Sequence, residues 1–236
     1  RRSRELRDRL FVLLATDRRP ATSTSGLRPG EVVLVGGGPG DPDLLTVGGL
    51  RALQEADVVL YDHLAPQASL AECRPDAVLL DVGKLPRGRQ TPQAEINGLL
   101  VAYARSGARV VRLKGGDPFV LGRGGEEWLA CVEAGVGVRV VPGVSSAVAG
   151  PALAGIPLTH RGLSQDFTVV SGHVGPGDPG STVNWDALAL TAGTIVVLMG
   201  VARLAEICGG LVARGLASDT PAAIVARAGL PEQRVV

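Results

Sequence analysis

Three glycine-rich turns hold the residues whose types and spacing best suit binding chemistry. They are GGGPGDPD (36–43), LKGGDPFVLGRGGEE (113–127) and VPGVSSA (141–147), and each follows or closes a short apolar run. Glycine permits close approach of a ligand to the backbone, and ligands of open α/β sheets bind outside the carboxyl ends of the strands. The turns therefore predict a cleft rimmed by backbone that suits a small polar ligand.

The first turn does not match the phosphate-binding motifs. Gly36 and Gly38 fit the start of G-x-G-x-x-G, but Asp41 stands at the third glycine position, where its carboxylate would repel a pyrophosphate. Pro39 lacks an N–H donor, and no Gly-Lys-Ser/Thr follows as in a P-loop. Taken alone, this motif fits a purely structural strand-to-helix turn as well as a ligand site.

The second and third turns leave a similar choice. Two glycine pairs surround Asp117 and Arg123, which places bare backbone beside charged side chains. In the third turn, Ser145 or Ser146 either caps the helix that follows or contacts a ligand, and both interpretations stay open.

Apolar runs and helical stretches alternate from Glu31 onward and would position these turns. Thr91 is expected to cap the second of the predicted helices, with Pro92 at its first position. Strands are predicted over 32–35, 57–61, 77–82, 109–113, 138–141, 167–171, 194–198 and 222–225, and helices over 44–55, 92–105, 145–154 and 202–214. This alternation predicts an α/β fold with a largely parallel sheet.

The composition shift near residue 30 and a Pro-Gly turn after residue 141 divide the chain. Residues 1–30 are expected to be a leader or linker, either disordered or the tail of an upstream domain. Residues 31–141 are expected to form an N-terminal α/β lobe and residues 142–236 a C-terminal α/β lobe, which we expect to be truncated. The chain begins with Arg and has its only methionine at Met199, so we expect a fragment or a processed chain.

Length and composition exclude several classes of protein. The 236 residues are 45% hydrophobic with a net charge of +1, which predicts a folded core and no general affinity for nucleic acid or anionic membranes. No apolar run approaches the length of a membrane span. Cys73, Cys131 and Cys208 form no CxxC pair, which predicts a reducing cytoplasm and no zinc cluster.

Seven segments then identify a family by their order along the chain. They are GGGPGDPDLLT, ADVVLYDHL, VGK, TPQAEIN, VRLKGGDPFVLGRGGEE, VPGVSSA and GIPLTHRG. In this order they resemble the uroporphyrinogen-III C-methyltransferases of the tetrapyrrole methylase superfamily, from about Glu31 to the last residue. The GGDPFVLGRGGEE stretch is the most specific, since methylases of later corrin intermediates lack the full RGGEE continuation.

The resemblance implies a fold and a reaction. It implies two α/β lobes with the active site in the cleft between them, and a homodimer. The reaction transfers methyl groups from S-adenosylmethionine to two ring carbons of uroporphyrinogen III, giving precorrin-2 for siroheme and cobalamin synthesis, without a metal. The donor carries a sulfonium and no phosphate, which agrees with a glycine-lined cleft that contains carboxylates.

The resemblance also assigns roles position by position. Asp62 matches the family's proton acceptor and Lys84 its proton donor. The donor-binding positions are Pro39, Gly115, Gly116, Asp117, Val120, Ser145, Ser146, Met199 and Ala228, although the family more often has Thr-Ala at the serine pair and Gly at 228. The substrate is a polycarboxylate, which arginine binds bidentately, and the substrate positions are Arg87, Arg89, Arg112, Arg123, Glu126 and Arg161.

Two other functions remain open at this point. One is a methylase of a later precorrin intermediate, against which the RGGEE continuation argues. The other is a domain that binds S-adenosylmethionine or a tetrapyrrole without turnover, against which Asp62 and Lys84 argue.

Overall fold

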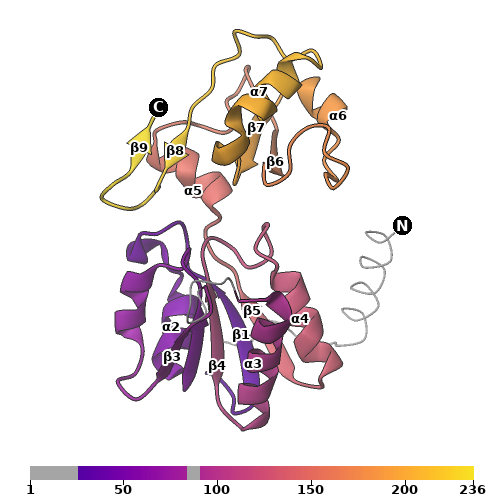
Figure 1. Ribbon diagram of the computed structural model, residues 1–236. Helices are drawn as coiled ribbons and strands as arrows, with labels where there is room; N and C mark the ends of the chain where they lie inside the picture. The colour runs from indigo at the N-terminus through magenta and orange to yellow at the C-terminus, as the bar shows by residue number, and fades with distance from the viewer. Residues whose placement is uncertain (1–25, 84–90) are drawn as a thin grey trace. The chain divides into compact units, whose positions relative to one another are not determined.

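The computed structural model describes residues 26–83 and 91–236, and these form two compact units (Figure 1). The first unit ends at Ser145 and the second is Ser146–Val236. The boundary expected after residue 141 precedes this division by one short turn. Most of the expected leader lies outside the described residues, as do Lys84, Arg87 and Arg89.

The first unit is built on a parallel sheet. Its order in space is β3 (Val78–Asp81), β2 (Val58–Tyr61), β4 (Val110–Lys114), β1 (Glu31–Gly36) and β5 (Gly137–Val141). β1 is buried on both faces, as expected for a β-branched run covered on each side by helices. β1 and β4 are paired so that Gly36 aligns with Lys114, and their following turns therefore leave the sheet at the same edge.

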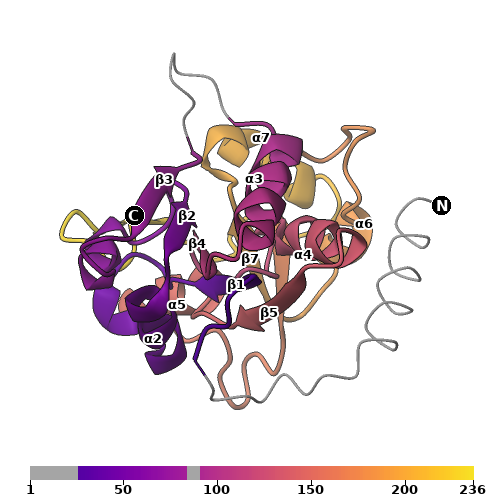
Figure 2. The same cartoon turned by 90° about the horizontal axis from the view of Figure 1, so that it is seen from below.

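Helices cover both faces of this sheet (Figure 2). On one face, α2 (Val47–Glu55) packs Leu53 against Val33 and Val35 of β1. On the other face, α3 (Gln93–Arg105) and α4 (Gly124–Glu133) pack against the alternate residues of β1 and β4. Strand alternation therefore sends Val110, Arg112 and Lys114 toward α3 and α4.

Two of the expectations for these helices were wrong. Thr91 does not cap α3: the cap position is Pro92, the helix begins at Gln93, and the buried Thr91 hydroxyl has no hydrogen-bond partner among the described residues. Pro92 keeps an extended ψ of 141°, so the first helical turn starts one residue later than expected. Helix α4 was not predicted at all, because the glycine pairs before and at its start were interpreted only as a turn.

The second unit has a smaller parallel pair of strands, β6 (Phe167–Ser171) and β7 (Thr194–Leu198), which match their predicted ranges. Around this pair lie α5 (Ser146–Leu153), α6 (Trp185–Ala189) and α7 (Leu204–Val212). Trp185, Leu188, Ile207 and Leu211 form the core against Val170. β8 (Val225–Ala226) and β9 (Arg234–Val235) form a short antiparallel ladder. The strand predicted over 222–225 corresponds to β8, which is shorter and begins at Val225.

The three glycine turns of the sequence pack against one another in the first unit. A Cβ on Gly36 would lie 2.5 Å from the backbone nitrogen of Gly143 and 2.7 Å from the carbonyl oxygen of Gly116. A Cβ on Gly143 would in turn collide with that same Gly116 carbonyl and with the backbone of Gly36. The turns after β1, β4 and β5 therefore meet with no room for a side chain between them.

We expect Gly143→Ala to lower the free energy of unfolding by about 1–3 kcal/mol, because the new methyl group must displace backbone rather than a flexible side chain. The matched control is Gly137→Ala in β5, whose added Cβ would have nothing within 4 Å. Urea unfolding of both variants checks this. Equal stability of the two variants would contradict the close packing of the turns.

An ion pair also ties the first unit together at the opposite, amino-terminal ends of β2 and β4. Asp57 accepts hydrogen bonds from the Arg109 side chain at 2.7 and 2.9 Å and from the Arg74 side chain at 3.2 Å. The hydrogen bonds from Arg109 lower the pKa of Asp57 from 3.8 to about 2.

This pKa makes stability depend on pH in a defined direction. Because the folded pKa lies below the unfolded value, the contribution of Asp57 is complete above about pH 4 and is lost as the pH falls toward 2. With the side chain 36% exposed, solvent screening limits the contribution to about 1 kcal/mol. We expect Asp57→Asn to lose this part of the pH dependence in urea unfolding, and identical pH profiles for variant and parent would contradict it.

Candidate functional site

The turns after β1 and β4 are joined by a pair of backbone hydrogen bonds at the carboxyl edge of the sheet. The Gly116 N–H donates to the Gly38 carbonyl at 2.6 Å, and the Gly38 N–H donates to the Gly116 carbonyl at 3.2 Å. Gly116 has a φ of +63°, which favours glycine at this position. Pro39, Gly115, Gly116 and Asp117, four of the predicted donor-binding residues, therefore lie in two turns that contact each other.

Asp117 holds two of the turns in place. Its Oδ1 accepts a hydrogen bond from the Phe119 N–H at 2.8 Å, and its Oδ2 accepts one from the Gly143 N–H at 3.1 Å. The family resemblance implies a ligand-binding role for this carboxylate, which stays a prediction. Its observed contacts are to the backbone of its own turn and of the turn after β5.

The loop after Asp117 exposes apolar side chains beside these turns. Phe119, Val120 and Leu121 are 52%, 38% and 43% exposed, and Leu121 adopts a φ of +54°. Apolar side chains and bare backbone suit a ligand with an aromatic or apolar part and no phosphate. Together with the half-buried Pro39 they fit a nucleoside such as that of the expected methyl donor.

Asp62 follows β2 at the same edge of the sheet, and its carboxylate is held on both oxygens. Oδ1 accepts from the Leu64 and Ala65 backbone N–H groups, each at 3.1 Å. Oδ2 accepts from Nη2 of Arg112 at 2.8 Å. The Asp62 side chain is 26% exposed, so the predicted proton acceptor can reach a ligand while its orientation is fixed from within the protein.

Arg112 was expected to bind substrate, but the structure places its side chain inside the protein with 3% exposed. Its Nε donates to Glu127 at 3.0 Å, Nη1 donates to the Leu113 carbonyl at 2.8 Å, and Nη2 donates to Asp62. A guanidinium with these hydrogen bonds holds Asp62 in place. It does not point toward solvent, where it could bind a carboxylate of the substrate. Direct contact with substrate stays untested for Arg112, and its burial argues against it.

Glu127 is the charged residue that the sequence analysis missed. Its side chain is fully buried, and its Oε1 accepts from Arg112 and from Nζ of Lys114 at 3.1 Å. Two patterns could have revealed it: the alternation that puts Arg112 and Lys114 on one face of β4, and the buried spacing of Gly124, Glu127 and Cys131 in α4. The second pattern required knowing that α4 is a helix.

Two predicted substrate residues at the start of α4 pair with each other. Nε and Nη2 of Arg123 each donate to a separate oxygen of Glu126 at 2.8 Å, and both side chains are about half exposed. The hydrogen bonds from Arg123 lower the pKa of Glu126. Arg123 has a φ of +57°, a conformation that costs a non-glycine residue about 1–3 kcal/mol and is concentrated at functional sites.

The second unit carries Ser146, Met199 and Ala228 on elements that contact one another. α5, which begins at Ser146, contacts both β7 and β8, and a Cβ on Gly150 of α5 would lie 3.9 Å from the Cβ of Ala228. Met199 follows β7 with a φ of +59° and is 52% exposed, so it is not a core methionine. Arg227, directly before Ala228, also has a positive φ of 53°. These two strained positions mark the ends of β7 and β8 as a candidate site.

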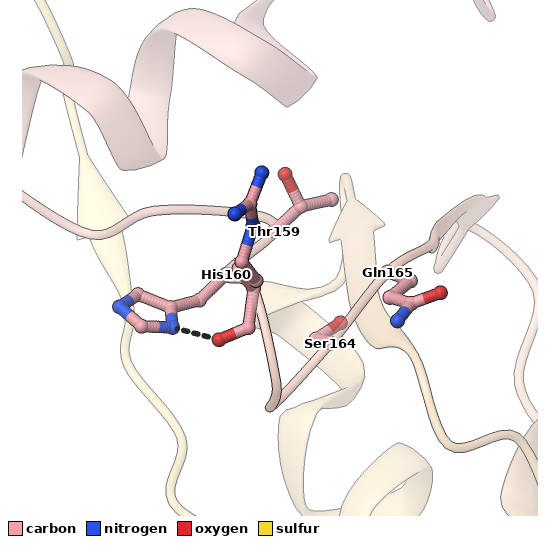
Figure 3. A pocket seen from close by; sticks show the side chains of 5 residues that line it. Thr159, His160, Ser164 and Gln165 are labelled. Carbon is pink, nitrogen blue, oxygen red and sulfur yellow. Dashed lines mark hydrogen bonds between the residues drawn. The ribbon is translucent and has the colours of Figure 1, made fainter.

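Arg161 lies in a tight loop of the second unit that lines a shallow pocket (Figure 3). The loop is closed by paired backbone hydrogen bonds between His160 and Ser164, and Nδ1 of His160 hydrogen-bonds the Arg161 carbonyl at 2.9 Å. The other lining residues are Thr159 and Gln165. An exposed arginine among neutral polar side chains suits a carboxylate group of a ligand.

Some predicted features have no structural test. The proton-donor position Lys84 and the substrate positions Arg87 and Arg89 lie outside the described residues. Within residues 26–83 and 91–236, no group of three or more His, Cys, Asp or Glu is arranged to hold a metal ion. In the same ranges, no helix has the length and apolar character needed to cross a bilayer.

The dual role of Asp117 in the backbone gives a test that needs no ligand. We expect Asp117→Asn to lower the free energy of unfolding by about 1–3 kcal/mol, because an amide has only one oxygen and leaves the Phe119 or Gly143 N–H unpaired. Thermal and urea unfolding measure this, with the exposed Asp43→Asn as the matched control. If the Asp117 carboxylate only bound a ligand, Asp117→Asn would leave the free energy of unfolding of the ligand-free protein unchanged.

Comparisons with known proteins show the family of this chain. Residues 31–236 match the family model described as tetrapyrrole (corrin/porphyrin) methylases. The siroheme synthase of Thiobacillus denitrificans is 50% identical over 207 residues, which cover 88% of this chain and 43% of that protein. The chain thus spans less than half the length of this curated relative.

Solved structures are similar over most of both chains. Uroporphyrin-III C-methyl transferase from Thermus thermophilus, complexed with S-adenyl homocysteine, has a TM-score of 0.73 and 44% identity, covering 87% of this chain and 82% of that one. A cobalt precorrin-4 methyltransferase has a TM-score of 0.77 and 31% identity, covering 88% and 84%. The predicted α/β fold and family are therefore confirmed, and the chain belongs to the tetrapyrrole (corrin/porphyrin) methylases.

Proposed function

We propose that this chain is an S-adenosylmethionine-dependent C-methyltransferase that methylates uroporphyrinogen III at two ring carbons to give precorrin-2, for siroheme or cobalamin synthesis. The observation that carries the proposal is the 44% identity, over most of both chains, to a uroporphyrin-III C-methyl transferase whose structure holds S-adenyl homocysteine. The precorrin-4 enzyme has a similar TM-score but lower identity, so sequence rather than fold favours uroporphyrinogen III.

S-adenosylmethionine, when bound, supplies a methyl group already activated by the sulfonium. A ring carbon forms the new C–C bond as the C–S bond breaks, with its electron pair left on sulfur, and the ring becomes cationic. Asp62 accepts the proton that the alkylated ring must lose. Lys84 is the proton donor when the ring takes up a proton. A carboxylate is sufficient as the proton acceptor because a cationic alkylated ring is a strong carbon acid.

The chain's main contribution is alignment of donor and ring carbon, which can be worth roughly 7–11 kcal/mol. We assign donor binding to Pro39, Gly115, Gly116, Asp117, Val120, Ser145, Ser146, Met199 and Ala228. The substrate's carboxylates are bound by Arg123 and Arg161, with Arg87 and Arg89 from the segment outside the described residues and Glu126 as the partner that orients Arg123.

We also propose that the protein is a homodimer without a metal and acts in the cytoplasm. The family resemblance supports the dimer, and the free thiols of Cys73, Cys131 and Cys208 support a reducing compartment. Sedimentation of the purified protein tests the dimer, and a monomer at assay concentration that turns over substrate would overturn it.

The direct test is incubation of the full chain with S-adenosylmethionine and enzymatically generated uroporphyrinogen III under anaerobic, metal-free conditions. We expect a product in which two methyl groups have each replaced a proton, formed with two equivalents of S-adenosylhomocysteine. Methylation of a later precorrin but not of uroporphyrinogen III would move the assignment to the precorrin methylases. Binding of both ligands by a folded chain without turnover would indicate a non-catalytic domain.

We expect Asp62→Asn to lower kcat by about 100-fold or more while changing donor affinity by less than about twofold, because the amide keeps the turn but cannot take a proton. Asn can still accept from the Leu64 and Ala65 N–H groups, so the fold is preserved. Steady-state kinetics and calorimetry with S-adenosylhomocysteine measure both values. Retained turnover in this variant would remove Asp62 as the proton acceptor.

A further inference from the structure

Four charged side chains form a continuous chain from the interior of the first unit to its surface. Nζ of Lys114 and Nε of Arg112 both contact Oε1 of Glu127, at 3.1 and 3.0 Å, and Nη2 of Arg112 contacts Oδ2 of Asp62 at 2.8 Å. The two cations balance the two carboxylates. This chain of side chains runs from the buried Lys114 through the fully buried Glu127 and Arg112 to Asp62, which is partly exposed.

Arg112 is constrained along its whole guanidinium. Glu127 accepts from Nε, the carbonyls of Leu113 and Leu60 accept from Nη1 at 2.8 and 3.4 Å, and Asp62 accepts from Nη2. A planar guanidinium with partners on three nitrogens cannot rotate without breaking hydrogen bonds. Its position therefore transmits the position of Glu127 to Asp62.

Glu127 is itself fixed from two elements. Lys114 of β4 and Gln93 of α3, whose Nε2 lies 3.3 Å from Oε1, both donate to it. Its other oxygen, Oε2, is buried with no hydrogen-bond partner among the described residues. Burial lowers the pKa of Lys114, and burial beside the Glu127 charge raises the pKa of Cys131 to about 12. All three observations place the Glu127 carboxylate in an environment that strongly disfavours an unpaired charge.

Stability alone does not account for such a group. Burying an ion pair costs about as much in lost hydration as it gains in attraction, and apolar replacements of similar volume are often as stable. A carboxylate with one unpartnered oxygen is less favourable still. The exposed end of this chain of charged side chains suggests its role, because the one member that is partly exposed is Asp62, the proposed proton acceptor.

We propose that Glu127 is a positioning residue for methyl transfer: acting through Arg112, it sets the orientation of the Asp62 carboxylate that receives the ring proton. This inference rests on the proposed function and adds to it a residue that does not touch substrate. Arg112 has the intermediate position, as the group that carries the constraint from α4 to the turn after β2.

The test is Glu127→Gln in the full chain, which keeps the shape of the side chain and removes its charge. We expect kcat to fall about 10–100-fold, as for a small misplacement of a reacting group, with the affinity for S-adenosylhomocysteine and KM for uroporphyrinogen III changed by less than about twofold. The matched control is Glu95→Gln, which removes an exposed carboxylate from α3 and should leave all three values unchanged.

A double-mutant cycle separates positioning from a general structural effect. If Glu127 acts through Asp62, then adding Glu127→Gln to Asp62→Asn should change the residual turnover by less than about twofold. Independent, multiplying losses would overturn the proposal, as would a wild-type kcat in the folded Glu127→Gln variant. An inactive parent chain would instead count against the proposed function.

A second variant covers the case in which Glu127→Gln does not fold, as judged by circular dichroism and thermal unfolding. Combining Glu127→Gln with Lys114→Met removes one buried charge of each sign and leaves Arg112 paired with Asp62. We expect this variant to fold, to bind S-adenosylhomocysteine normally and to show the same loss of kcat. A folded double variant with full kcat would overturn the proposal.

Discussion

The pairing of Arg112 with Glu127 is the interaction on which the candidate site of the first unit depends. Neither side chain has meaningful contact with water, so each charge is tolerable only because the other is close and well oriented. The pair joins β4 at the centre of the sheet to α4 on its face. As a consequence, Asp62, which directly follows the neighbouring strand β2, contacts a cation whose position is already fixed.

The parallel sheet provides the second constraint. Because β1, β2 and β4 run in the same direction and in register, their following turns leave at one edge, and the chemically useful residues are the first residues after each strand. Gly36, Gly116 and Gly143 then allow the turns to pack backbone against backbone. Asp117 closes this arrangement with hydrogen bonds to two turns, so the rim of the site is held by its own backbone rather than by large side chains.

Much of this arrangement could be predicted from local sequence. The β-branched runs gave the strands of both units, and β6 and β7 were predicted to the residue because each is a compact apolar run between polar turns. The glycine spacing gave the converging turns. The family resemblance gave Asp62 its role, and the structure places it at the expected edge, although no observation yet tests the role itself.

The errors at Arg112 and Glu127 came from long-range effects, and the error at Thr91 came from a local one. Arg112 looked like a surface cation because charge within a short segment says nothing about the layer that covers it, and here α3 and α4 cover this face of the sheet. Glu127 was overlooked beside Glu126 for the same reason: which of two adjacent carboxylates points inward depends on where the helix begins. The Thr91 cap failed because the conformation of Pro92 delayed the helix by one residue.

We propose that the turns after β1, β4 and β5 form part of a site for an adenosyl methyl donor. The most direct test is calorimetric titration of the folded chain with S-adenosylhomocysteine. We expect saturable binding of one molecule per chain with micromolar affinity, competed by S-adenosylmethionine and not by ATP. A folded chain that releases no heat with S-adenosylhomocysteine, or that binds ATP equally well, would contradict the claim.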